Sequence, residues 1–515
     1  MSHVDTQAAF LATTPSRRNS ALMLFVGSQT LLLVIVVRNL LLIPICLRYI
    51  AESVFGAWLA LSGVLAFLCL ADFGINNLLV QRTAKHYGAR DWTMLGKTIA
   101  SGLATVLVLA SAVFLAAQSV ASQAPAWMGL DEACRPEFVW AVRLAIVDAV
   151  LLLGDMSMSG VLLGLQRPAG YLVGLIVGQA FGIVLTLVLL AWGMQLLAVP
   201  AGMLAGTVVA FAVNVVVLRR LVRTILPSGL TRFDLATARD LLKASGWLFV
   251  VRLARVFVLR SNGMIVAIVL SAPLVIVYEV TWKASLLITD AIGRISQSLF
   301  PGLVHLGGAG EHEKMRKIVR LQIHLITRLG LLAAGLVFVF NRGFVGLWTG
   351  DRYFGGNELS GLLCLYAVVQ LWNTATYSVV FAVGRIKRVT VAALCEAVLQ
   401  ISLSIFLGAL WGLRGIAIAA MAASFSGLVI QGLGLIAVLE CRFSWRSVLR
   451  ATLDYAAVAA VQAAAATFVL RCWPPDGWCS FALVVACSAA LGGTVLVLGD
   501  AKLRSVLLHR GQQRT

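Results

Sequence analysis

The sequence predicts an all-α polytopic membrane protein with about fourteen transmembrane helices, and three observations lead to this fold class. Hydrophobic residues make up 60% of the 515 residues and charged residues only 12%, whereas a soluble domain is usually about 45–50% apolar and about 25% charged. Fourteen apolar runs are long enough to cross a bilayer, which takes about 20 residues. Lysine and arginine gather mainly in every second segment that connects these runs.

The fourteen runs follow one another with short connections. Their centres lie near residues 34, 64, 107, 150, 181, 208, 259, 287, 331, 371, 400, 425, 461 and 489. The first run, residues 21–46, is too long for the core of a signal peptide and has no small-residue cleavage site behind it. We therefore expect it to remain as the first span.

The distribution of positive charge predicts the orientation of the chain. Of the 41 Lys and Arg residues, 27 fall in segments predicted to face the cytoplasm and six in predicted external loops. This bias follows the positive-inside rule and places both termini in the cytoplasm. The same rule explains the net charge of +19, so we expect a multi-pass membrane protein and no nucleic-acid partner.

A weak internal repeat predicts two related halves. The fourth run ends GVLLGLQR at residues 160–167 and the tenth ends VVFAVGRIKR at residues 379–388, six spans later. Such a repeat is typical of transporters with a central site between pseudo-symmetric bundles. The predicted domains are a cytoplasmic tail (1–20), a six-helix bundle (21–224), a cytoplasmic linker (225–245), a second six-helix bundle (246–440), two further helices (451–499) and a cytoplasmic tail (500–515).

Four charged residues in the eighth run are unusual for a membrane helix. Glu279, Lys283, Asp290 and Arg294 fall within about 60° of one another on a helix of 3.6 residues per turn. Two i,i+4 pairs along this stripe are able to neutralise one another. Because a charge at the bilayer centre costs about 2.5–3.5 kcal/mol or more, the stripe is expected to face protein or water.

Charge is concentrated in the first, fourth, seventh and eighth runs, where cations outnumber anions. Seven cations (Arg38, Arg143, Arg252, Arg255, Arg260, Lys283 and Arg294) stand against four anions (Asp148, Asp155, Glu279 and Asp290). Structural ion pairs that join helices would tend to balance, whereas guanidinium groups suit an anionic ligand such as phosphate. A cation-lined cavity and simple helix-joining pairs both remain open, and we favour the cavity.

These residues give a list of candidate sites. The predicted substrate-binding residues are the seven cations together with Asn373 and Tyr377 from the polar face of the tenth run. The predicted ion-coupling residues are Asp155, Glu279 and Asp290, because intramembrane carboxylates can carry protons or bind Na⁺. Membrane potential acting on the charged cavity is an alternative drive.

The segment at residues 47–91 carries two motifs. It contains Glu52, Phe55, Gly56 and Trp58 at the start of the second run, and the sequence Asp-Phe-Gly (residues 72–74) at its end. It resembles the start of Wzx-type polysaccharide flippases, which belong to the multidrug/oligosaccharidyl-lipid/polysaccharide exporter superfamily. Shorter matches are GLQR (164–167), LWTGDRYFGG (347–356) and GRIKR (384–388). The family's Tyr-Leu-Gly before the first motif is replaced by Tyr-Ile-Ala (residues 49–51).

The resemblance implies an activity. Such proteins move polyprenyl-pyrophosphate-linked oligosaccharides to the periplasmic leaflet of the bacterial inner membrane by alternating access. The resemblance therefore implies this location, contact with membrane lipids, and the polysaccharide polymerase and export machinery as partners. The two helices beyond the usual twelve would line a groove for the lipid tail or serve as packing elements. Alternatives are a lipid II flippase of the same superfamily, against which the motifs of the second run weigh, and a cation-coupled multidrug exporter, against which the excess of arginine weighs.

Other functions have little support in the sequence. No nucleotide-binding glycine-rich loop or metal-ligand spacing is apparent, so we expect neither an enzyme nor a cofactor. Asp72 is expected to cap the helix that follows it. Nine cysteines lie mostly in apolar runs, where they act as small hydrophobes. Cys472 and Cys479 flank one predicted external loop and would form either a disulfide or two packed thiols.

Overall fold

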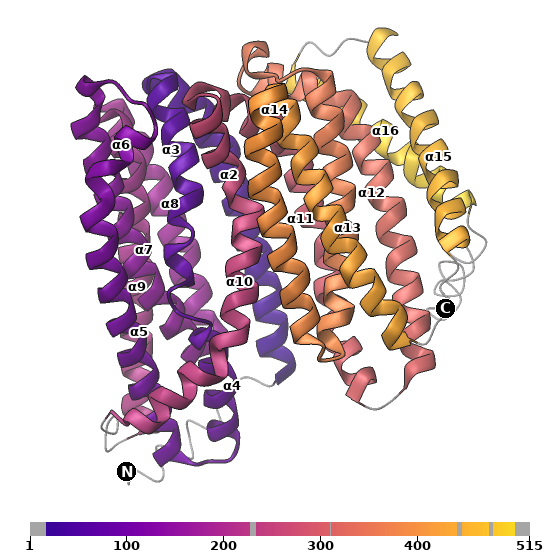
Figure 1. Ribbon diagram of the computed structural model, residues 1–515. Coiled ribbons are helices and arrows are strands. Elements are labelled where there is room, and N and C mark those ends of the chain that lie inside the picture. Colours follow the sequence, from indigo (N-terminus) through magenta and orange to yellow (C-terminus); the bar gives the residue numbers. More distant parts are fainter. Residues whose placement is uncertain (1–16, 227–232, 309–310, 440–444, 473–476, 500–515) are drawn as a thin grey trace. The chain divides into compact units, whose positions relative to one another are not determined.

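The protein folds into helices joined by short loops. The structure is a computed structural model that describes residues 17–226, 233–308, 311–439, 445–472 and 477–499, and within these ranges it contains no strand. The helices divide into two compact units, Met1–Val275 and Ile276–Thr515 (Figure 1). The predicted all-α class is therefore confirmed.

The centre of each of the fourteen predicted runs lies in a helix, and the second run continues past the end of α3. The first unit contains α2 (Arg17–Tyr49), α3 (Glu52–Leu65), α4 (Ile75–Gly88), α5 (Trp92–Val120), α6 (Ala124–Trp127), α7 (Arg135–Gly164), α8 (Pro168–Ala191), α9 (Ala198–Ile225) and α10 (Leu235–Val269). The second contains α11 (Ala272–Gly308), α12 (His312–Trp348), α13 (Asn357–Ala382), α14 (Ile386–Leu439), α15 (Trp445–Cys472) and α16 (Trp478–Gly499). α10 lies in the first unit, and the domain boundaries expected from the sequence stay a prediction.

Ten helical segments in the described residues are long and apolar enough to cross a membrane, which confirms a multi-pass protein. The segment in α14, Lys387–Leu435, has 49 residues and carries two of the predicted runs. Gly412 breaks it with φ 60° and ψ −139°, a conformation that glycine adopts without a steric penalty. We call residues 386–411 and 413–439 the first and second segments of α14. The full count of fourteen spans stays a prediction.

Glycines bring α8 and α9 close together in the first unit. A Cβ at Gly206 would lie 2.5 Å from the backbone oxygen of Gly178, and one at Gly182 would lie 2.7 Å from that of Gly202. Spacings of four residues place such glycines on one face of each helix. Small residues at this spacing allow membrane helices to pack with their backbones in contact.

The motif glycine of the second run has a similar packing role. A Cβ at Gly56 would collide with the backbone oxygen of Ala272, the first residue of α11. A Cβ at Gly63, two turns later, would lie 2.6 Å from the backbone oxygen of Arg260 in α10. The close approach of α3 to α10 therefore depends on glycine at position 63, and its approach to the start of α11 depends on glycine at position 56.

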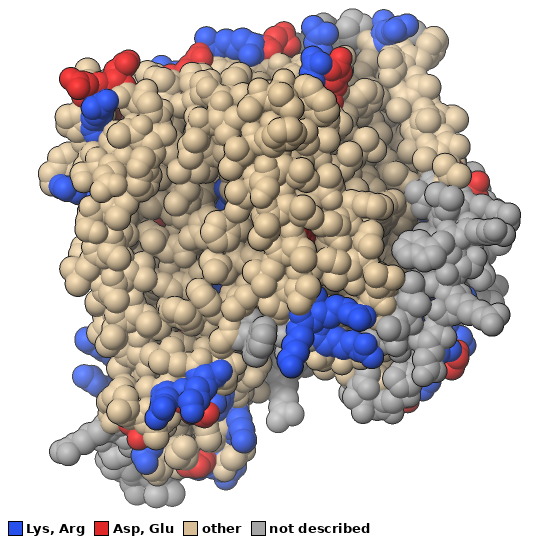
Figure 2. Space-filling model, viewed as in Figure 1, with Lys and Arg blue, Asp and Glu red and all other residues tan. Residues whose placement is uncertain are grey.

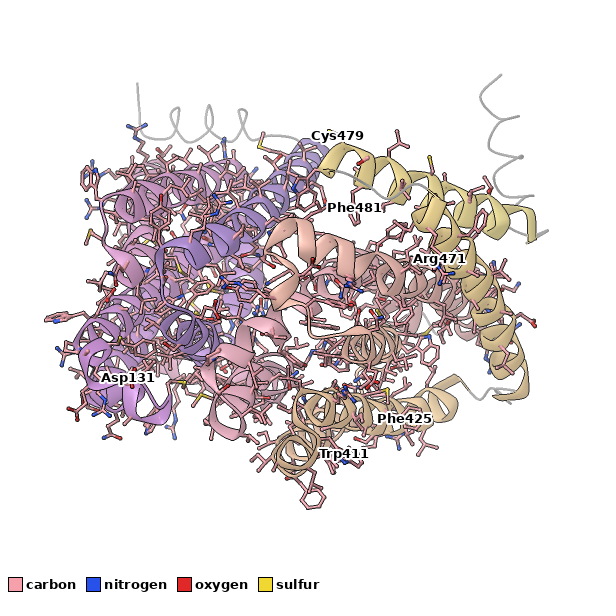
Figure 3. All side chains as sticks on the ribbon, turned by 90° about the horizontal axis from the view of Figure 1, so that it is seen from above. Asp131, Trp411, Phe425, Arg471, Cys479 and Phe481 are labelled. Carbon is pink, nitrogen blue, oxygen red and sulfur yellow. The ribbon has the colours of Figure 1, made fainter. Side chains whose placement is uncertain are left out.

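In the second unit, α15 and α16 pack on α12. Phe340 of α12 meets Phe481 of α16 edge to face, with ring centroids 5.8 Å apart. Ala466 and Val484 complete this apolar cluster. Figure 3 labels Phe481 and, at the start of the same helix, Cys479. Cys479 is a free thiol, so the disulfide that the sequence left open is not formed; the side chain of Cys472 lies outside the described part.

Candidate functional site

Charged side chains lie mainly at the ends of the helices. On the face shown in Figure 2, Lys, Arg, Asp and Glu gather at the two ends, and the broad band between them is almost uncharged. This pattern fits a lipid-facing surface, since a bilayer's hydrocarbon core is about 30 Å thick and excludes charge. Polar residues away from the two ends are therefore the candidates for a functional site.

A polar cavity lies inside the first unit, between α2, α7, α8 and α9. Its volume is about 220 Å³, and it is lined by Arg38, Asp148, Gln179 and Thr207 together with the glycines of α8 and α9. The Arg38 Nη1 donates to the Gln179 Oε1 at 2.7 Å. Asp148 is 7% exposed, and its Oδ1 has no hydrogen-bond partner in the described residues.

The glycines explain why this cavity exists. Gly178, Gly182, Gly202 and Gly206 all line it, and their missing side chains leave space between two helices whose backbones touch. Within that space stand a guanidinium, a carboxylate, an amide and a hydroxyl. Such a set can hold water or a small ion, because each member can make hydrogen bonds in a site otherwise formed by apolar helices.

A second polar contact joins α7 to α9, about two helical turns after Asp148 along α7. Asp155 is 1% exposed and accepts a hydrogen bond at 2.7 Å from the Asn214 Nδ2. The same nitrogen lies 3.5 Å from the Ser159 Oγ. This predicted ion-coupling carboxylate is thus already bound to an amide within the first unit, and its role in coupling stays a prediction.

The Asp-Phe-Gly motif forms a turn that binds an arginine. Asp72 is fully buried and accepts from the Gly74 backbone N–H at 3.1 Å. It also pairs with the Arg252 Nη1 at 3.1 Å. Phe73 and Gly74 have φ values of 50° and 83°. Gly74, not Asp72, is the N-cap of α4, and it makes no side-chain cap bond, so the expected capping role is corrected to a turn and an ion pair.

The predicted cations of the first unit are held in different ways. Arg252 is occupied by Asp72, as a helix-joining pair would be. The Arg143 guanidinium lies 5.2 Å from the centroid of the Trp140 ring, and Trp140 is 58% exposed, so this side chain follows an exposed surface. Arg255 also has an interaction partner. Arg260 is exposed and makes no ion pair with any described residue.

The charged stripe of α11 is not closed by ion pairs along the helix. Glu279, Lys283 and Arg294 are partly exposed and Asp290 is exposed. Within the described residues, neither Glu279 nor Lys283 forms an ion pair, so the i,i+4 neutralisation considered from the sequence is absent at this pair. Asp290 does have an interaction partner. Two of the stripe's charges are therefore available to another group.

Aromatic rings lie near the end of α11 that carries Arg294. Tyr377 of α13 stacks on Phe381 with centroids 5.6 Å apart and an interplanar angle of 9°. Phe300 of α11 lies 5.7 Å from the Phe381 ring. Gln322 of α12 bridges α11 and α13, because its Nε2 donates to the hydroxyls of Ser296 and Ser378. Tyr377 is thus placed in an aromatic group.

Asn373 points into the second unit and reveals a residue that the sequence analysis missed. Asn373 is 1% exposed, and its Nδ2 donates to the Glu396 Oε2 at 2.9 Å. Glu396 is 4% exposed and lies in the middle of the eleventh apolar run. A lone intramembrane carboxylate is a signal in itself; it was missed because it has no charged neighbours at helical spacing.

The two helices at the C-terminal end of the second unit enclose an apolar groove. Its volume is about 400 Å³, and its lining is formed by small and aliphatic residues of α15 and α16 together with Gln462 and Ser488. Gln462 donates to the backbone oxygen of Ser488 at 3.0 Å. Elsewhere, the described residues contain no group of three or more His, Cys, Asp or Glu side chains able to hold a metal ion.

Solved structures with this fold are membrane transporters. The chain is similar to an inward-facing MATE family multidrug transporter of the MOP superfamily, with TM-score 0.60 and 15% identity, covering 79% of this chain and 96% of that one. It is similar to the lipid II flippase MurJ, with TM-score 0.61 and 11% identity, covering 87% and 98%. A MOP superfamily transporter from Pyrococcus furiosus, described as having a binding pocket of reversed polarity, gives TM-score 0.56 and 14% identity, covering 83% and 98%.

The protein therefore has the fold of the MOP superfamily transporters. Among curated proteins none matches the chain. The family described as "Polysaccharide biosynthesis protein" matches residues 24–306, which is more than half of the sequence, and the chain belongs to this family. The resemblance to Wzx-type flippases noted from residues 47–91 agrees with both findings.

Proposed function

We propose that the protein is a flippase that carries polyprenyl-pyrophosphate-linked oligosaccharide repeat units across the bacterial inner membrane by alternating access. The observation that carries this proposal is the family match over residues 24–306 on a chain with a transporter fold. The family description supplies the link to polysaccharide, and the fold supplies transport across a membrane.

The cations available in the structure support a pyrophosphate-linked cargo. Arg260 and Lys283 lie in apolar helices and make no ion pair with any described residue. Two cations without carboxylate partners are costly in a membrane unless an anion or water meets them. A pyrophosphate would supply such an anion to either cation, and arginine binds phosphate oxygens through two parallel hydrogen bonds. Tyr377 would contact the sugars, and Glu279 stays a candidate for ion coupling.

The function is tested by the lipid intermediate that accumulates without the protein. A deletion strain is expected to accumulate lipid-linked repeat units on the cytoplasmic face of its inner membrane, identified by mass. Arg260→Ala and Lys283→Ala are each expected to give the same accumulation at normal protein levels. The matched control is Arg342→Ala, which removes an exposed arginine at the predicted external end of α12. Normal polysaccharide export by both the Arg260 and the Lys283 variants would exclude these cations as substrate ligands.

Lipid II flipping is the second candidate, because the MurJ structure aligns over 87% of this chain. The two functions differ in the accumulated molecule. A lipid II flippase would leave a peptide-bearing muropeptide intermediate, whereas the proposed function leaves an intermediate without peptide. Accumulation of the peptide-bearing species would replace our proposal with this second function.

A further inference from the structure

The second unit contains a buried carboxylate that none of the sequence motifs indicates. Glu396, in the first segment of α14, accepts three hydrogen bonds: from the Asn373 Nδ2 at 2.9 Å, from the Gln370 Nε2 at 3.4 Å and from the Ser424 Oγ at 2.5 Å. All three donors are at most 5% exposed. Two belong to α13 and one to the second segment of α14, so the carboxylate joins three helical segments.

The packing around Glu396 leaves room for the carboxylate and little more. A Cβ at Gly427, on the second segment of α14, would lie 2.8 Å from the Glu396 Oε2 and 3.2 Å from the Asn373 Nδ2. A larger ligand than a proton would therefore have to push the helices apart. The site is suited to a ligand that needs no volume of its own.

The hydrogen bonds around this carboxylate do not balance in a single arrangement. The Gln370 Nε2 carries two hydrogens, yet it lies within 3.4 Å of three acceptors: the Tyr366 hydroxyl, the Ser424 Oγ and the Glu396 Oε1. At the same time the Asn373 Oδ1 is buried and has no hydrogen-bond partner among the described residues. The Asn373 oxygen therefore lacks a donor, while the Gln370 nitrogen faces one acceptor more than it has hydrogens.

One added proton removes the mismatch. When Glu396 is protonated, its O–H becomes a donor. Rotation of the Gln370 amide by 180° then presents an oxygen, with two lone pairs, to the Tyr366 and Ser424 hydroxyls, and the new O–H donates to the Ser424 Oγ. Rotation of the Asn373 amide would offer the O–H a second acceptor. The same side chains thus form one network around the ionised carboxylate and a different network around the neutral acid.

We propose that Glu396 is the proton-binding site of the second unit, where the carboxylate takes up one H⁺ to become a carboxylic acid and later releases it. This proposal rests on the proposed transport function for its purpose. Protonation exchanges the bonds that join α13 to both segments of α14, and the two networks favour different arrangements of these helices. A ligand that binds one state of a protein better shifts the population towards that state.

Several groups that contact Glu396 do not titrate. On α13 these are the amides of Gln370 and Asn373, and on the second segment of α14 they are Ser424 and Gly427. The Tyr366 phenol, which does titrate, contacts Gln370. On the helix of Glu396 the adjacent residue is Cys395, which is partly buried.

Proton binding is measured directly on the purified protein by infrared difference spectroscopy during pH steps. The wild type is expected to gain the C=O band of a protonated carboxylic acid as pH falls, and Glu396→Gln is expected to lose that band. Asp155→Asn, which alters a buried carboxylate of the first unit, is the matched control and should keep it. An unchanged band in Glu396→Gln would overturn the proposal.

A second variant covers the case in which Glu396→Gln does not fold. Ser424→Ala removes one of the three donors to the ionised form and should move the appearance of the band to higher pH. A band that appears at the same pH as in the wild type would also overturn the proposal. Because this measurement needs no substrate, a failure of the flippase assay with an intact titrating band would count against the transport function alone.

Discussion

The contact between α8 and α9 allows one substitution to be predicted in both sign and size. In Gly206→Ala, the new Cβ would lie 2.5 Å from the Gly178 backbone oxygen, whereas carbon atoms pack best at about 3.5–4.0 Å. The two helices must therefore separate by about 1 Å, because the obstructing atom is backbone and cannot rotate away. Overpacking of this kind costs about 1–3 kcal/mol, and we take the upper end.

Alanine also favours the helix over glycine by about 1 kcal/mol, so the net loss is about 2 kcal/mol. For a unit of this size that loss lowers the midpoint of thermal unfolding by about 4–8 °C. The assay is thermal unfolding of the purified protein, followed by tryptophan fluorescence. The matched control is Gly246→Ala in α10, where the new Cβ meets nothing within 4 Å and the midpoint should stay or rise. An equal midpoint for both variants would refute the close packing.

Two further predictions concern Asp72 and Asp234. Asp72→Ala should lower the thermal midpoint, because it leaves Arg252 and the Gly74 N–H without their acceptor; loss of one partner of a buried ion pair costs about 3–5 kcal/mol, and the 32% exposure of the Arg252 side chain favours the lower end. Asp131→Ala, at the rim in Figure 3, should leave the midpoint unchanged, and an equal effect of both substitutions would contradict the ion pair. Asp234 caps α10, and hydrogen bonds from Thr237 lower the pKa of the Asp234 carboxyl from the ordinary 3.8. The contribution of this cap to stability is therefore present above the unfolded pKa and is lost as pH falls through the lower folded pKa. Amide exchange at the start of α10 should therefore rise in acid in the wild type, and Asp234→Asn should show no such rise; the same pH dependence in both proteins would exclude the cap as its cause.

Much of the fold follows from the sequence because membrane helices are governed by composition. Backbone groups in the hydrocarbon must be satisfied within each segment, so long apolar runs predict helices directly, and the centres of all fourteen runs lie in helices. The break at Gly412 is also visible as a glycine between two runs. The packing of α10 against α3 cannot be predicted from apolar runs, because it depends on a glycine of α3 that meets a helix about 200 residues later in the chain.

The partners of the candidate site residues could not be predicted from the sequence. Helical periodicity groups the α11 stripe on one face, but it cannot tell whether i,i+4 charges pair or turn towards another group. Arg252 and Arg143 were selected as cations within apolar runs, and in the structure Arg252 pairs with Asp72 while the Arg143 guanidinium lies over the Trp140 ring. Glu396 was passed over because its partners come from α13 and from the far side of the Gly412 break.

The sequence by itself determined that this chain is a helical, multi-pass protein of the polysaccharide biosynthesis family, because apolar length, charge bias and short motifs are properties of consecutive residues. The tertiary structure alone decided which buried charges are already paired, where a polar cavity opens between glycine-lined helices, and which amides surround Glu396. Those features arise from contacts between residues distant in the chain, and the energy of a charge in a membrane depends on the atoms that meet it.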